Sequence, residues 1–534
     1  MKTEKYDYII AGAGTAGCIL AHRLTEAGYN VLLVEAGGSD NHWTVRMPGG
    51  LRAHYKPKSQ FNYHYYSVPQ KHLNNREVYQ PRGRALGGSA SINGMVFLRG
   101  HAQDYERWVK QGAQGWGYSD VLPYFKRLES CEAGADDYRG NNGPVNVRKQ
   151  TDLSELDQVF LAAGRDGDFP YTDDVNGHQQ EGFCRFDMNV DKGVRASTAY
   201  AYLHKFKGRI SPKIRLNTLV EKLVFEGDRV VGIQYRQGRD SKIAYAEKEV
   251  ILSLGAFGTP QLMMLSGIGP AAHLHEMGIK SRVDLPGVGQ NLQDHLEVHI
   301  QHHCTKPISL NRYLRPDRMV QAGVRWFVSK TGVCARNQAN TGAFLKTSDS
   351  IAHPNIQFHF FPVFFDGWDP RHDVSGYLLD TGPMRPTSVG EVRLKSGDPS
   401  QSLAIDPNFF ATKSDREETI DGFELGRETL RQAAFAEYDA GEAIPGPQVK
   451  TRKQIEEFIR EHAGSAYHPC GTCKMGADDD AMSVVDVNGI VRGIQGLRVV
   501  DASIMPSIAS SNINAVVMMI AEKLSDVILG NKPL

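Results

Sequence analysis

The segment that most constrains the fold lies at residues 6–35, where two apolar runs flank a glycine-rich turn and a helical pattern. Residues 6–11 are rich in β-forming side chains, residues 16–27 carry apolar side chains at helical spacing, and residues 31–35 form a second apolar run that ends in an acid. Gly28 is expected to end the helix. A Gly-x-Gly-x-x-Gly turn in this setting predicts a β-α-β dinucleotide-binding unit.

Each glycine of this turn has its own expected task. Gly12 permits the tight turn, Gly14 lets the backbone approach a pyrophosphate, and Gly17 lets the helix pack closely on the strand. The helix N-terminus then offers amide donors to the phosphates. Glu35 closes the second strand and is placed to bind a ribose 2′-hydroxyl, which favours an adenosine without a 2′-phosphate.

The bulk properties exclude several classes of protein. The 534 residues carry 61 basic and 61 acidic side chains, without the basic excess of a nucleic-acid-binding protein. No apolar run reaches the roughly 20 residues that span a bilayer, and residues 1–7 lead straight into a strand without a signal-peptide region. Seven scattered cysteines favour a reducing cytoplasm. Peripheral membrane association and self-association stay open.

Cys470 and Cys473 form a Cys-x-x-Cys pair, a spacing found in zinc sites and redox proteins. A zinc site of this kind needs a second such pair, and the sequence has none. No thioredoxin-like unit surrounds the two cysteines either. We therefore expect no metal at this position.

Three further segments add to the N-terminal turn. Residues 83–94 form a glycine- and serine-rich loop, residues 255–269 a second glycine-containing segment, and residues 466–476 a turn that carries His468. In this order the motifs resemble those of the glucose-methanol-choline (GMC) flavoprotein oxidoreductases, and the resemblance covers nearly the whole chain. It implies FAD as the cofactor, because the glycine turn alone does not separate NAD from FAD.

The resemblance also implies the architecture. We expect an α/β fold with a Rossmann-like FAD-binding domain and an α+β substrate domain whose antiparallel sheet lies over the flavin. The FAD-binding domain is expected at 1–155, 201–297 and 460–534, and the substrate domain at 156–200 and 298–459. Apolar periodicity further predicts strands at 249–254 and 497–502 and a final helix at 515–529.

Residues expected at the cofactor follow from the fingerprint and from the resemblance. They are Gly12, Gly14, Thr15, Ala16, Gly17, Glu35, Ala36, Gly87, Ser89, Asn93, Gly94, Val96, Val220, Asp501, Ala502 and Asn514. Some choline oxidases of this family tether FAD through a histidine at the position of Ile92. Isoleucine cannot form that bond, so we expect non-covalent FAD.

Oxidation of an alcohol by a flavin requires a hydride acceptor and a base for the hydroxyl proton. Histidine suits the second task because its unperturbed pKa of about 6.5 is close to working pH. The resemblance assigns this role to His468 and a partner role to Asn512, whose amide can bond the substrate oxygen without competing as a base. An alternative for Asn512 is a helix N-cap.

Three further segments indicate the substrate. Residues 173–182, 291–298 and 500–506 resemble the choline-dehydrogenase branch of the family. This resemblance implies that Glu297 faces the ammonium of a choline-like primary alcohol. A quaternary ammonium favours a carboxylate and aromatic rings, which Tyr467 and Phe360 or Phe361 could supply. The expected reaction is oxidation of a small primary alcohol to the aldehyde.

One departure opens an alternative. Where choline-specific relatives place aromatic residues, this chain has residues 336–342, including Arg336 and Asn340. An arginine facing the pocket would bind a carboxylate, which favours a small hydroxy acid such as 3-hydroxypropionate. An FAD-dependent lyase and a non-catalytic flavin-binding protein are alternatives of another class. The electron acceptor stays open among oxygen, a quinone and an artificial dye.

Overall fold

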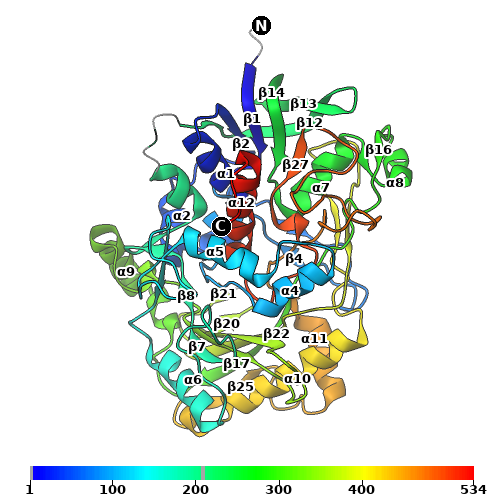
Figure 1. The fold of residues 1–534 in the computed structure, drawn as a ribbon. Coiled ribbons are helices and arrows are strands. Elements are labelled where there is room, and N and C mark those ends of the chain that lie inside the picture. The colour runs from blue at the N-terminus through cyan, green and yellow to red at the C-terminus, as the bar shows by residue number, and fades with distance from the viewer. Residues whose placement is uncertain (1–3, 206–207, 209–210, 368) are drawn as a thin grey trace.

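The structure, a computed structural model, describes residues 4–205, 208, 211–367 and 369–534. Two seven-stranded sheets organise the chain. Figure 1 shows one of them in the upper half of the molecule and the other in the lower half. Segments from both ends of the chain meet in the upper half, where the first strand and the last helix lie close together.

The upper sheet has the strand order β11-β2-β1-β14-β13-β12, and β27 also pairs with β14. Strands β11, β2, β1, β14 and β27 run parallel, whereas β13 and β12 form an antiparallel hairpin on β14. The strands are β1 (Glu4–Ala11), β2 (Val31–Val34), β11 (Lys213–Arg215), β12 (Thr218–Glu226), β13 (Arg229–Gln237), β14 (Asp240–Leu252) and β27 (Leu497–Val499). Parallel strands covered on both faces are apolar throughout, as β2 is.

The predicted β-α-β unit forms the centre of this sheet. Helix α1 (Thr15–Glu26) connects β1 to β2, begins one residue before the predicted start and ends before Gly28, whose φ is +93°. It packs against α12 (Asn514–Leu529), the predicted last helix. The predicted strand at 249–254 is the end of the longer β14, which continues into the hairpin.

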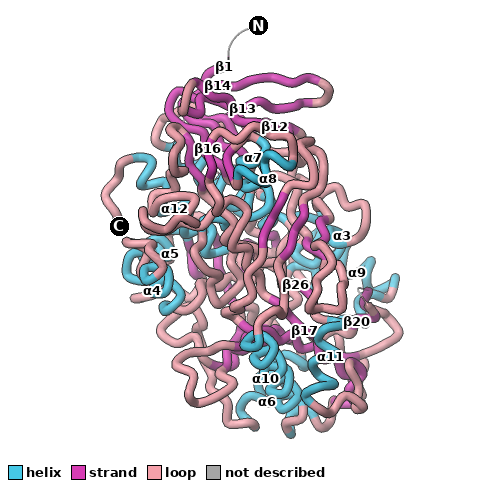
Figure 2. The backbone as a smooth tube through the Cα atoms, turned by 90° about the vertical axis from the view of Figure 1, so that its right-hand side faces the viewer, coloured by secondary structure: helices cyan, strands magenta, loops and turns pink. Residues whose placement is uncertain are grey.

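The lower sheet is antiparallel, with the order β25-β17-β22-β19-β18-β7, and β26 pairs with β17. Its strands are β7 (Gly182–Arg185), β17 (Leu296–Cys304), β18 (Thr341–Leu345), β19 (Ile356–Phe361), β22 (Gly376–Pro383), β25 (Asp439–Ile444) and β26 (Gly464–Ser465). Helices α6 (Glu155–Asp166), α10 (Lys413–Leu430) and α11 (Arg452–His462) pack on one face of this sheet, below β17 in Figure 2. The predicted α/β fold with a second, antiparallel sheet is confirmed.

The predicted domain boundaries remain predictions, but the sheets show where each segment lies. Strand β7, from the segment 156–200, joins the lower sheet. Strand β26 lies in the segment 460–534, expected in the upper domain, and pairs with β17 of the lower sheet. The chain therefore brings residues just before His468 to the junction of the two halves.

Shorter elements connect the two sheets. The remaining α-helices are α2 (Trp43–Arg46), α3 (Arg52–Tyr55), α4 (Ala102–Lys110), α5 (Tyr118–Leu128), α7 (Gly255–Leu265), α8 (Ala271–Glu276) and α9 (Pro316–Ser329). The remaining strands are β3 (Tyr65–Tyr66), β4 (Tyr79–Gln80), β5 (Glu129–Cys131), β6 (Val145–Lys149), β8 (Asp187–Met188), β9 (Val190–Asp191), β10 (Val194–Arg195), β15 (Ile268–Gly269), β16 (Val283–Asp284), β20 (Phe365–Asp366), β21 (Asp369–Pro370), β23 (Glu391–Arg393) and β24 (Ala404–Asp406). In the part of the chain that is described, no helix combines the length and apolar character needed to cross a bilayer.

Candidate active site

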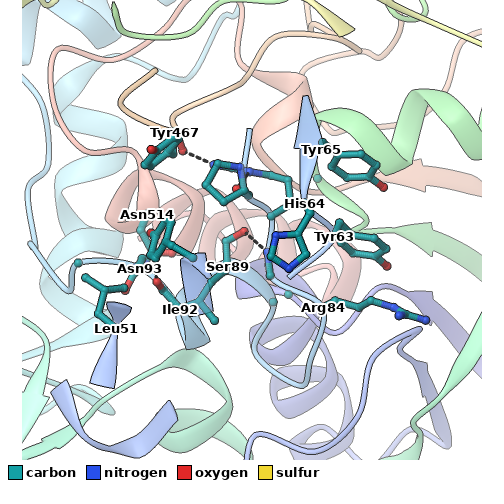
Figure 3. A pocket seen from close by; sticks show the side chains of 18 of the residues that line it. Leu51, Tyr63, His64, Tyr65, Arg84, Ser89, Ile92, Asn93, Tyr467 and Asn514 are labelled. Carbon is teal, nitrogen blue, oxygen red and sulfur yellow. Dashed lines mark hydrogen bonds between the residues drawn. The ribbon is translucent and has the colours of Figure 1, made fainter. Parts of the chain in front are cut away.

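A cavity of about 1480 Å³ is lined by residues of both halves, from the turn after β1 to strand β19 of the lower sheet. Pockets for one small ligand measure roughly 300–1,000 Å³, so this cavity has room for a dinucleotide together with a substrate. Figure 3 shows Tyr467, Asn93 and Asn514, from three distant segments of the chain, among the side chains that line it.

The glycine turn after β1 forms one end of the cavity. A Cβ on Gly12 would collide with the carbonyl oxygen of Ser253, and a Cβ on Gly17 with that of Gly12. Gly14 and Gly94 line the cavity, and a Cβ on Gly94 would meet no atom within 4 Å, so bare backbone borders the open space here. A flat or extended ligand can therefore lie directly against the main chain.

Glu35 lies at the same end of the cavity as the glycine turn. Its carboxylate accepts hydrogen bonds from the amides of Ala13 at 3.1 Å and Gly37 at 2.8 Å, and it lines the cavity. Burial raises the pKa of Glu35 to about 7, although both amides act in the opposite direction. The remaining lone pairs of the carboxylate are suited to accept from a ribose hydroxyl.

Two contacts fix the middle of the cavity. The Thr15 hydroxyl donates to Asn514 Oδ1 at 2.8 Å and so joins the start of α1 to the start of α12. Asp501 accepts from the Gly255 amide at 2.9 Å and from the Thr259 hydroxyl at 2.6 Å, which fixes the start of α7. The site at this point is thus assembled from both ends of the chain.

Most residues expected at the cofactor line the cavity. They are Gly12, Gly14, Thr15, Ala16, Glu35, Ala36, Ser89, Asn93, Gly94, Val96, Val220, Asp501, Ala502 and Asn514. Gly17 and Gly87 lie behind this layer: Gly17 packs on Gly12, and the Gly87 amide donates to Ala13 at 2.7 Å. The bare backbone, the helix N-terminus and the Glu35 carboxylate fit the phosphates and ribose of FAD.

His468 and Asn512 meet at the other end, as the sequence predicts. Asn512 Nδ2 lies 3.0 Å from His468 Nε2, and the His468 amide donates to Asp294 at 2.7 Å. The N-cap alternative for Asn512 is not observed, since α12 begins at Asn514 and no side chain caps it. Burial lowers the pKa of His468 well below its usual value, and His295 adds to this effect, so the imidazole is neutral near pH 7.

His295 determines which nitrogen of His468 carries the proton. His295 Nε2 lies 2.9 Å from the Met384 carbonyl oxygen, which can only accept, so Nε2 is protonated. Burial lowers the pKa of His295 to about 4, so its Nδ1 is an acceptor. That atom lies 3.0 Å from His468 Nδ1, which therefore donates. The lone pair of His468 is thus on Nε2, which faces Asn512.

Glu297 lies in the same part of the cavity, paired with His359. The Glu297 carboxylate is 3.4 Å from His359 Nδ1, and His359 Nε2 is 3.2 Å from Asn512 Oδ1. Burial raises the pKa of Glu297, but the hydrogen bond and charge of His359 outweigh it and lower the pKa overall. Burial lowers the pKa of His359, and Glu297 raises it overall. Both shifts favour the charged forms of the pair, a carboxylate on Glu297 and an imidazolium on His359.

Sequence reasoning missed His295 and His359 as site residues, and of its alternatives Phe360 and Phe361 only Phe361 lines the cavity. Strand β19 alternates, so Phe358 and Phe360 face the helices while His359 and Phe361 line the cavity. Phe360 is fully buried and its ring stacks on Phe160 of α6 at 4.6 Å. The signal was available, because two apolar residues two apart mark the core face of the strand and place His359 opposite.

The expected substrate residue Arg336 also lies elsewhere. Its guanidinium contacts the backbone oxygen and, at 3.6 Å, the carboxylate of Asp152, and it is not among the described residues that line the cavity. Asn340 is likewise absent from that lining and is buried behind it. Their neighbours Asn337, Gln338 and Ala339 form the wall here, while Tyr467 lines the cavity as expected.

The Cys-x-x-Cys pair lies away from this chemistry. Cys470 and Cys473 are buried free thiols, and burial raises the pKa of each well above its usual value. Within the described ranges, no three His, Cys, Asp or Glu side chains are arranged to hold a metal ion.

Comparison with known families assigns the chain. GMC oxidoreductase family models match residues 6–297 and 386–521. The chain belongs to the GMC oxidoreductase family. GMC oxidoreductases bind FAD and act on CH–OH groups, so this protein is an FAD-dependent oxidoreductase that requires an alcohol substrate and an electron acceptor.

The relatives of this GMC oxidoreductase cover nearly its full length. The mitochondrial choline dehydrogenase of Homo sapiens is 46% identical over 99% of this chain and 91% of its own. The oxygen-dependent choline dehydrogenase of Photobacterium profundum is 44% identical over 99% and 94%. Pyridoxine 4-oxidase from Mesorbium loti, a solved structure, is 29% identical over 98% and 99%, with a TM-score of 0.89. The protein is a choline-dehydrogenase-like GMC enzyme.

Proposed function

We propose that this enzyme oxidises choline, or a closely related alcohol that carries a quaternary ammonium, to the aldehyde. The observation that supports this most is the Glu297 carboxylate, which lines the cavity near His468 and Asn512 and is held ionised by His359. A buried carboxylate beside the rings of Tyr467 and Phe361 suits a quaternary ammonium.

The hydroxy-acid alternative has less support. It depended on Arg336 facing the substrate, and this guanidinium is bonded to Asp152 outside the cavity lining. The choline dehydrogenases among the relatives add to the case for a cationic alcohol, since they match the chain almost from end to end.

In the proposed mechanism His468 acts as the base and Asn512 orients the substrate. When the alcohol binds, its hydroxyl takes the place of the Asn512 amide on the lone pair of His468 Nε2, and the released amide donates to the alcohol oxygen. His468 Nε2, neutral and unprotonated, then accepts the hydroxyl proton. Glu297 positions the ammonium so that the carbinol carbon faces the cofactor end of the cavity. FAD, when bound there, supplies the hydride acceptor.

His359 has two proposed tasks in this arrangement. As an imidazolium it keeps Glu297 ionised, and through Nε2 it bonds Asn512 Oδ1, which leaves the Asn512 amide hydrogens directed at His468 and the substrate. It does not compete as the base, because its pKa is raised whereas that of His468 is lowered.

A substrate comparison tests the proposal. Under anaerobic conditions, choline, 3-hydroxypropionate and a neutral primary alcohol are mixed with the holoenzyme, and bleaching of the flavin is followed. We expect rapid bleaching with choline. Glu297→Gln, which keeps the side-chain size, should raise the KM for choline about 30-fold or more, because losing one partner of a desolvated charge pair costs roughly 2 kcal/mol or more.

The neutral alcohol is the control, since its turnover should change little in Glu297→Gln. Faster bleaching by 3-hydroxypropionate than by choline would refute the proposal, as would an equal effect of the substitution on both alcohols.

We also propose that FAD is held without a covalent bond at Ile92. This residue lines the cavity next to Asn93, and its side chain offers no atom for a tether. Precipitation of the denatured enzyme with acid should leave the flavin absorbance in the supernatant. Flavin that stays in the washed pellet would contradict this.

A further inference from the structure

Helix α9 (Pro316–Ser329) carries an exposed apolar face. Val320, Val324 and Val328 follow one another at intervals of four residues and therefore share a face, and they are 63%, 57% and 82% exposed. Met319 and Phe327 flank this row and are also more than half exposed. Soluble proteins rarely leave so many large apolar side chains together in water without a function for them.

This exposure is not a sign of a loosely attached helix. Trp326, on the opposite side of α9, is buried, and its indole nitrogen donates to the Gly193 carbonyl at 2.7 Å. The ammonium of Lys330 lies 3.7 Å from the centre of the Trp326 ring. The helix is thus anchored on one side and presents its apolar side outward, and Figure 1 shows it protruding from the side of the molecule.

A second aromatic residue extends the face. Trp43 of α2 is half exposed, and its ring centre lies 5.8 Å from that of Phe327. We call the combined surface the α9 patch; it consists of Trp43, Met319, Val320, Val324, Phe327 and Val328. Exposed tryptophan and phenylalanine beside aliphatic side chains are typical of protein surfaces that enter a lipid–water interface.

The charge around the α9 patch is strongly biased. Residues 312–330 contain five basic side chains and one acidic one, a net charge of +4, whereas the whole chain is neutral. Arg318 and Arg325 are seven residues apart on α9 and share its polar side. An apolar face bordered by arginines and a lysine is complementary to a bilayer surface, which has anionic headgroups over an apolar interior.

The α9 patch is continuous with the wall of the cavity. Trp43, Met319, Val320 and Phe327 belong to the patch and also line the cavity, as does Gly323. A surface that covers the patch therefore also lies against this part of the cavity wall.

We propose that the α9 patch docks on the surface of an anionic phospholipid bilayer, with α9 lying in the interface. A second copy of the chain or another protein fits less well, because stable protein interfaces involve about 20–30 residues a side, and the patch has six, most of them on one protruding helix. Basic residues around an aromatic and aliphatic face match a bilayer surface directly. This inference does not depend on which alcohol is oxidised.

Vesicle flotation tests the proposal. The holoenzyme is mixed with vesicles of phosphatidylcholine alone or with phosphatidylglycerol, and the floating fraction is measured. We expect binding to the anionic vesicles and at least tenfold weaker binding for the double variant Val324→Glu, Val328→Glu. Neither residue lines the cavity, so dye-linked activity and flavin content should stay unchanged. Arg318→Gln should weaken binding to the anionic vesicles about fivefold.

A matched control replaces another exposed apolar residue. Ile243→Glu changes an exposed isoleucine of β14, in the upper sheet, and should leave flotation as in the unmodified enzyme. No flotation of the unmodified enzyme with either vesicle would overturn the proposal. So would equal flotation of the double variant, or a dimer in sedimentation velocity that the double variant converts to a monomer without any vesicle binding.

Discussion

At the scale of single residues, the site depends on three polar side chains around the base as much as on the base itself. His468 is neutral because it is buried, and its protonated nitrogen is set by His295, which is held in turn by the Met384 carbonyl. On the other side Asn512 and His359 complete the contacts. The Met384 carbonyl at one end and the Glu297 carboxylate at the other fix the direction of these hydrogen bonds.

These contacts make His295 a positioning residue with a testable effect. His295→Phe removes the acceptor for His468 Nδ1, so the proton can occupy either nitrogen and the base is lost part of the time. We expect flavin reduction by the alcohol to slow about 10- to 100-fold, a part of the roughly 10²–10⁴ that a positioned base contributes. The KM should change little, which stopped-flow reduction at several substrate concentrations would measure.

His295→Gln serves as the matched variant, since its amide oxygen can accept from His468 and its nitrogen can donate to Met384. Recovery of part of the rate is expected. An unchanged rate in His295→Phe would mean that His468 needs no such partner.

From the sequence, residues that belong to a motif could be placed relative to one another, whereas the face on which a side chain outside a motif lies could not. His468 and Asn512 were expected together and lie together. Arg336 was judged from its neighbours in the chain, but a side chain of that length reaches Asp152, far away in sequence. Phe360 was one residue from a cavity-lining ring, and a shift of one residue in a strand reverses the face.

At the scale of elements, the turn between β1 and α1 shows why the fingerprint is so informative. Gly17 packs so closely on Gly12 that any side chain would collide with the main chain of the turn. Local geometry of this kind is encoded by adjacent residues, so the sequence predicted β1, α1 and β2 to within a few residues. The hairpin β12–β13 and the extension of β14 depend on pairing between strands and were not predicted.

We predict that Gly17→Ala destabilises the enzyme by about 1–3 kcal/mol, the usual cost of overpacking, and lowers its flavin content. Gly323→Ala is the control, because its Cβ would lie in open space in the middle of α9 and should be neutral or slightly stabilising. Thermal unfolding and the ratio of flavin to protein absorbance measure both effects. Equal stability of the two variants would contradict the packing argument.

At the scale of the whole molecule, the two sheets meet around one large cavity, and the residues expected to bind the cofactor line much of it. Its existence could not be predicted from sequence in physical terms, because it is formed by contacts such as Thr15–Asn514, whose partners are 499 residues apart. Only the family resemblance indicated that both ends of the chain contribute.

Removal of FAD should therefore lower stability across both halves. A ligand that binds the folded form adds about 2.7 kcal/mol when its free concentration is 100 times its Kd. The thermal midpoint of the apoprotein should rise as FAD is added back, and Asn514→Ala should need more FAD for the same rise. A midpoint that does not respond to FAD would show that the cavity keeps its form without it.

The hydrogen bond between Thr15 and Asn514 also has a consequence for how the enzyme is made. A ribosome makes the phosphate-binding turn 499 residues before its partner, which is roughly 25–100 s earlier at ordinary speeds of synthesis. During that interval the nascent chain has the glycine turn of the cofactor site but not the segment that carries Asn514. We therefore expect FAD to bind only after the segment that carries Asn514 has been made. Prematurely terminated chains should then bind no FAD and leave no partially active oxidant in the cell.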